Sequence, residues 1–198
     1  LALSNAGAKN LTTGGTVTGA TFTQTGGTVS VNENVDVTGS STLADVGSIS
    51  ATKNLRLTAA ATGGTITAMN NASTGTLENA GTGTLTVTTL SGNAGTINQS
   101  GGSTGKVAFT NNVTNGGTIQ TATGTLDFQG TGAQTNTGGT VTVTGAGFAE
   151  VAGDIATSPG TLTFNSASTV TYDGGTQTIA PVTYGTLVAG GSAAKTAS

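Results

Sequence analysis

Two close pairs of carboxylates are the residues of this chain best suited to chemistry: Glu33 with Asp36, and Glu150 with Asp154. Paired carboxylates can act as general acid and base, as in enzymes that cleave polysaccharides, or they can bind calcium. Neither pair has a third acidic residue beside it, and Arg56 is the sole arginine. The chain has no His and no Cys, so neither residue can serve as a nucleophile or a metal ligand.

We therefore interpret the acidic residues as solvated turn residues. The sequence predicts a protein that is not an enzyme, with no catalytic residue, no cofactor and no metal site. A β-helical polysaccharide-active enzyme is the alternative. The eight acids are Glu33, Asp36, Asp45, Glu78, Asp127, Glu150, Asp154 and Asp173.

The composition favours β-strands and excludes several other classes of protein. Charged residues are 7% of the 198 residues, against roughly 25% in an average soluble domain. Gly occurs 34 times and Pro twice, without the strict period of collagen, and the net charge of -3 is too small for typical disorder. Five basic residues make no patch for nucleic acid, and no apolar run is long enough to span a membrane.

A short phrase that begins Gly-Thr recurs along the chain. In "GTVTVTG", Val141 and Val143 alternate with threonines, which is the pattern of a one-sided strand. The first third is less regular, because Thr16, Thr28 and Thr65 follow one another at intervals of 12 and 37. Later phrases keep a period near 21, which indicates stacked repeats. Their opening threonines, at successive intervals of 20, 22, 22 and 21, are Thr76, Thr96, Thr118, Thr140 and Thr161.

The sequence predicts an all-β fold: a right-handed parallel β-helix (β-solenoid) with coils of about 21 residues, forming one domain over residues 1–198. Each coil would hold three short strands, and each strand would pair with its copies above and below at about 4.8 Å. A β-sandwich of the pilin type is the alternative. A sandwich core usually uses large aromatic residues, and the aromatic content of 4% favours the thinner solenoid.

Threonine pairs on exposed strand faces raise a further alternative function, an ice- or carbohydrate-binding surface. Regular Thr-x-Thr pairs on a flat sheet can order water or meet a crystal face. Exposed strand positions also prefer threonine for ordinary reasons, which weakens this interpretation. The pairs are Thr65 and Thr67, Thr84 and Thr86, Thr140 and Thr142, and Thr161 and Thr163.

The C-terminal phrase "TLTFNSASTVTYDGGTQTIAPVTYGTLVAGGSAAKT" resembles repeats of filamentous-haemagglutinin-like and autotransporter-like β-helical adhesins. The resemblance covers roughly the last fifth of the chain. It implies an elongated β-helix, secretion to the outside or the surface of a bacterial cell, and an adhesive or matrix role with no catalytic residues. Host or cell-surface glycans would then be possible partners. The matching residues are Val170, Tyr172, Asp173, Gly174, Gln177, Thr178, Ile179, Tyr184, Gly185, Leu187 and Lys195.

The two terminal phrases resemble each other, since Leu1 and Leu187 are 186 positions apart, as are Lys9 and Lys195. Neither phrase contains a recognisable cap, and an uncapped strand edge is a template for association. We therefore expect a structural extracellular protein that associates with copies of itself head to tail, as a fibre subunit or as a segment of a longer repeat protein. The expected self-association residues are Leu1, Leu3, Leu11, Tyr184, Leu187 and Val188.

Overall fold

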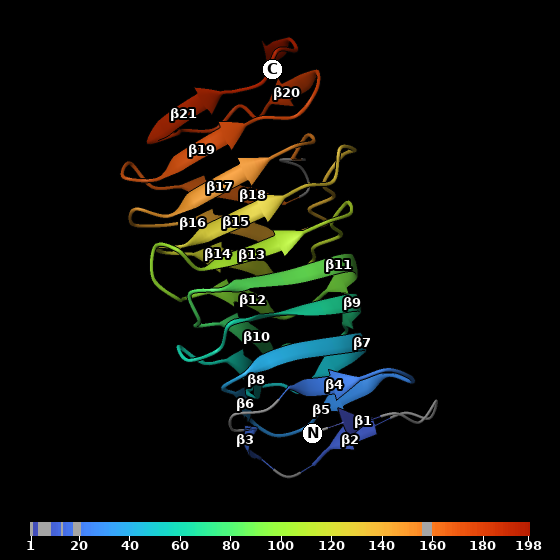
Figure 1. Cartoon of the computed structure of the whole chain (residues 1–198). Coiled ribbons are helices and arrows are strands. Elements are labelled where there is room, and N and C mark those ends of the chain that lie inside the picture. Colours follow the sequence, from blue (N-terminus) through green and yellow to red (C-terminus); the bar gives the residue numbers. More distant parts are fainter. Residues whose placement is uncertain (1, 4–8, 13, 18–20, 156–159) are drawn as a thin grey trace.

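The protein is a parallel β-solenoid of about eight turns with coils of about 21 residues. The computed structural model describes residues 2–3, 9–12, 14–17, 21–155 and 160–198. Figure 1 shows the coils stacked from the blue N-terminal end to the red C-terminal end. Every pair of described strands is parallel, which overturns the β-sandwich alternative. The right-handed winding stays a prediction.

The largest sheet, sheet A, has twelve strands among the described residues. β2 (Lys9–Leu11) and β5 (Val29–Val31) continue it on one side, where β5 pairs with the second half of β7. The other strands are, in spatial order, β1 (Ala2–Leu3), β4 (Phe22–Gln24), β7 (Ser40–Ile49), β9 (Gly63–Asn71), β11 (Thr84–Asn93), β13 (Lys106–Phe109), β15 (Thr125–Phe128), β17 (Phe148–Val151), β19 (Thr169–Tyr172) and β21 (Thr186–Ala189).

In the described part of the chain, the second sheet, sheet B, has eight strands, and β20 (Gln177–Ile179) pairs with β22 (Lys195–Ala197) in a third, two-stranded sheet. The five threonines of the regular period form one ladder in sheet B, each opposite the next. The strands of sheet B are β3 (Gly15–Val17), β6 (Val35–Val37), β8 (Asn54–Leu57), β10 (Thr76–Asn79), β12 (Thr96–Gln99), β14 (Thr118–Thr121), β16 (Thr140–Val143) and β18 (Thr161–Phe164).

The core is a narrow lumen filled by rows of inward-facing apolar residues from both sheets. Alternation places Leu77, Ile97 and Ile119 on successive rungs of sheet B, and all three are fully buried. In sheet A, Phe109 and Phe128 are also neighbours, and their rings stack with centroids 5.1 Å apart. Rows of equivalent residues therefore run along the solenoid and bind each coil to the next.

The glycine of the Gly-Thr phrase allows successive coils to approach closely. A Cβ added to Gly117 would lie 2.1 Å from the carbonyl oxygen of Gly95, and one added to Gly95 would lie 2.1 Å from that of Gly75. No side chain fits at such a distance. This contact explains why the phrase recurs once per coil before a sheet B strand.

A ladder of buried asparagines, which the sequence interpretation missed, runs beside these glycines. Asn71 donates through Nδ2 to Oδ1 of Asn93 at 3.3 Å, and Asn93 donates in the same way to Asn115 at 2.9 Å. Asn115 donates to Oδ1 of Asn136 at 2.9 Å. Asn93 also donates to the carbonyl oxygen of Gly95 at 3.1 Å, so the ladder satisfies backbone groups where the coil turns.

Candidate functional site

The first carboxylate pair suggested by the sequence is divided between two separate ion pairs. Glu33 accepts a hydrogen bond from Nζ of Lys53 at 2.7 Å. Asp36 binds Arg56 through both oxygens, at 3.0 Å from Nε and 2.7 Å from Nη2. The hydrogen bond and the charge of Asp36 raise the pKa of Arg56. Both carboxylates are thus paired with cations of the following coil.

The second pair is also separated, and Glu150 instead lies opposite Asp127 on neighbouring rungs of sheet A. Nζ of Lys106 donates to Asp127 at 3.1 Å and to Glu150 at 2.7 Å. Partial burial would lower the pKa of Lys106, but the two carboxylates outweigh it and raise the pKa. Asp154 lies beyond the strand, where Oδ1 accepts a hydrogen bond from the backbone of Thr178 at 2.7 Å.

The interpretation of the acids as turn residues is wrong for most of them. Asp36, Asp45, Glu78, Asp127 and Glu150 lie within strands. Asp173 follows β19, and burial together with the charges of Glu150 and Asp127 raises its pKa. Among the described residues, no group of three or more acidic side chains is placed to hold a metal ion. Four of the eight acids form ion pairs with a lysine or arginine of another coil, namely Glu33, Asp36, Asp127 and Glu150.

The C-terminal end of the solenoid exposes lumen residues. Within the described chain, β21 pairs with β19 alone. Leu187 lies opposite Val170 in the lumen row, yet it is 41% exposed while Val170 is fully buried. Val188 is 40% exposed, and strand alternation directs it to the outer face instead. The two residues are equally exposed, but only Leu187 faces the open end of the core.

The remaining expected association residues are distributed between the two ends. Leu3 and Leu11 are partly buried against the N-terminal end of the core, and Leu1 lies outside the described residues. Tyr184 packs at the other end, where its ring stacks on Phe164 with centroids 5.3 Å apart.

The hydroxyl of Tyr184 donates to the carbonyl oxygen of Ala180 at 2.7 Å. Burial and a hydrogen bond with Tyr172 raise its pKa. Tyr184 is therefore a packing residue that covers the last strand of sheet B.

The threonine pairs do not form one array. In sheet A, Thr86, the second threonine of its pair, lies opposite Thr65, the first threonine of the other pair, and Thr84 lies opposite Gly63. The two pairs there are therefore offset by two residues. In sheet B the pairs that begin at Thr140 and Thr161 do lie opposite each other. The described threonine pairs are thus split between two faces.

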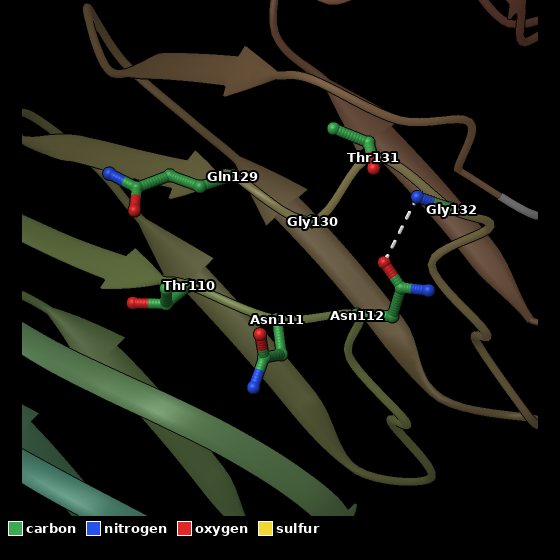
Figure 2. A pocket seen from close by; sticks show the side chains of 7 residues that line it. All are labelled: Thr110, Asn111, Asn112, Gln129, Gly130, Thr131 and Gly132. Atoms are coloured by element: carbon green, nitrogen blue, oxygen red, sulfur yellow. Dashed lines mark hydrogen bonds between the residues drawn. The ribbon is translucent and has the colours of Figure 1, made fainter.

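A polar groove lies where the chain leaves β13 and β15 (Figure 2). Its volume is about 560 Å³, and no charged residue lines it. Oδ1 of Asn112 accepts a hydrogen bond from the backbone of Gly132 at 3.1 Å, which joins the two loops. Nε2 of Gln129 donates to Asp127 at 2.9 Å. The lining residues are Thr110, Asn111, Asn112, Gln129, Gly130, Thr131 and Gly132.

Searches against known proteins found no relative for this chain. In the part of the chain that the structure describes, there is no helix of the length and apolarity needed to cross a bilayer. No protein-family model matches the sequence, and neither a curated protein nor a solved structure matches it.

Proposed function

We propose that this chain is a structural extracellular protein whose copies associate end to end into a cell-surface filament or an adhesin or matrix fibre. The observation that carries the proposal is the exposed lumen residue Leu187 on a strand, β21, that has one described partner. Leu3 and Leu11 offer apolar surface at the opposite end of the same lumen. An apolar end with a free strand edge is suited to receive another coil.

The energetic gain of such a contact comes from the backbone and from the lumen. Each new hydrogen bond between paired strands contributes only on the order of 1 kcal/mol to the free energy of association, because it replaces a hydrogen bond to water. Covering the exposed part of Leu187 contributes roughly 1 kcal/mol more. With charged residues at 7%, little electrostatic repulsion opposes close approach of two copies.

We further propose that the protein belongs with the filamentous-haemagglutinin-like and autotransporter-like β-helical adhesins that it resembles. Support comes from the β-solenoid architecture and from Tyr172 and Tyr184, which contact each other through a 3.0 Å hydrogen bond between hydroxyls. Under this proposal the chain is secreted to the bacterial surface, as a fibre subunit or a segment of a longer repeat protein. The enzyme alternative is less favoured, because Asp127 and Glu150 are both bound by Lys106.

The proposal is tested by electron microscopy and sedimentation of the purified chain with a matched pair of variants. We expect filaments from the wild type. Leu187→Lys places a charge at the open end of the lumen and should abolish assembly. Val188→Lys adds the same charge at the same exposure on the outer face and should leave assembly intact.

Circular dichroism would show that both variants keep their strands. A wild-type chain that stays monomeric at high concentration would overturn the proposal. Equal assembly by the two lysine variants would show that the lumen end takes no part in the contact.

As a second candidate function, we propose that the groove of Figure 2 contacts neutral glycans. Several polar groups there form no hydrogen bond to another described residue: Oε1 of Gln129, Oδ1 of Asn111, and the hydroxyls of Thr110 and Thr131. An uncharged lining of amides and hydroxyls matches the hydroxyl groups of a sugar better than it matches an ion.

A panel of immobilised neutral glycans tests this second candidate. We expect binding by the wild type that Gln129→Ala reduces at least tenfold. Gln120→Ala removes the same amide from the outer row of sheet B and serves as the control. Absence of binding to every glycan, or equal loss in both variants, would reject the groove as a glycan site.

A further inference from the structure

Two unbroken ladders in sheet A relate the first described strand to the last. Leu3 lies opposite Gln24, and the same row continues rung by rung through Ile66 and Phe128 to Ala189. The neighbouring row runs from Ala2 to Val188. β1 and β21 therefore hold equivalent places in their coils.

β2, which follows β1, and β22, which is the next strand after β21, begin at the same sequence distance from them. Lys9, which begins β2, follows Leu3 by six residues, and Lys195, which begins β22, follows Ala189 by six residues. Nζ of Lys195 donates to the carbonyl oxygens of Gly174 and Gly175 at 2.9 and 2.8 Å. The charge of Lys195 also partly offsets the burial that raises the pKa of Asp173.

Resting on the proposed function, we infer the register of the joint between two copies. β1 of one copy pairs with β21 of the next and β2 pairs with β22, so that Leu3 lies opposite Ala189 and Lys9 opposite Lys195.

Sheet B contributes less to this joint. Its last described strand is β18, over which Tyr184 is stacked on Phe164, one coil before β21. Continuity between copies therefore rests on sheet A and on the pairing of β2 with β22. The register of sheet A across the joint is therefore what an experiment must determine.

Cysteine cross-linking reads the register directly, because the natural chain has no Cys. Leu3→Cys with Ala189→Cys should form a ladder of reductant-sensitive multimers on oxidation. Within one molecule these positions are nine rungs apart, roughly 43 Å, so a disulfide between them must join two copies.

The control pair, Leu3→Cys with Val188→Cys, shifts one cysteine to the opposite face and should give no ladder beyond dimers. Each single variant should likewise stop at dimers. Filaments without a ladder in the first pair would overturn the register and leave the proposed function standing. Absence of both filaments and ladders would overturn the two together.

Discussion

Asn93 and Asn115 lie one coil apart, and Nδ2 of Asn93 donates a 2.9 Å hydrogen bond to Oδ1 of Asn115. Both residues are buried. Replacing Asn93 by Ala leaves buried partners unsatisfied and should lower the free energy of unfolding by about 1–3 kcal/mol in urea denaturation. Asn98→Ala, on the outer row of sheet B, should change it by less than about 0.5 kcal/mol. Similar losses in both variants would contradict a stabilising ladder.

The close approach at Gly117 predicts a second effect on stability. Gly117→Ala drives a Cβ into the carbonyl oxygen of Gly95 and should destabilise the fold by roughly 1–3 kcal/mol. At Gly102 an added Cβ meets nothing within 4 Å, so Gly102→Ala should be neutral or slightly stabilising. Thermal unfolding of the two variants provides the comparison, and a tolerated Gly117→Ala would refute the close-packing explanation.

Phenylalanines inside and outside the lumen should respond differently to truncation. Phe128 is 1% exposed and stacks on Phe109, so Phe128→Ala should cost about 3–5 kcal/mol of unfolding free energy through the cavity it leaves. Phe148 is 41% exposed, and Phe148→Ala should cost less than about 0.5 kcal/mol. Denaturant midpoints of the two variants would distinguish them, and comparable midpoints would contradict the assignment of Phe128 to the core.

Alkaline pH should selectively remove the contribution of Lys106. Because its folded-state pKa is raised above the ordinary value of 10.5, its stabilisation is complete below that value and is lost as pH rises through the raised pKa. Wild type should therefore exceed Lys106→Met in unfolding free energy at about pH 8, and the difference should shrink toward about pH 12. A difference that stays constant over this range would exclude the ion pair as its source.

The regular half of the solenoid could be predicted because one threonine per coil marks the start of a sheet B strand. In the irregular first third, the threonines of the recurring phrase lie on different faces of the coil. Thr16 belongs to β3 of sheet B, Thr65 belongs to β9 of sheet A, and Thr28 precedes β5. Because these three threonines belong to different ladders, the intervals between them do not show the coil period.

The carboxylate contacts could not be predicted from short-range spacing. Asp127 and Glu150 are separated by a full coil in the sequence, but stacking makes them neighbours. The asparagine ladder was accessible in principle, since Asn71, Asn93, Asn115 and Asn136 recur at intervals of 22, 22 and 21 along the sequence. The same period that identified the threonines would have identified these asparagines.

At each glycine before a ladder threonine, one coil can be removed from the sequence or added to it without changing the local Gly-Thr junction. Joining Gly95 to Thr118, after removal of residues 96–117, would recreate the Gly-Thr junction that already exists between Gly95 and Thr96. In-frame duplication or deletion in the gene can thus lengthen or shorten the rod by one layer, about 4.8 Å, while its walls keep their shape. The length of the solenoid can then change in steps of one coil.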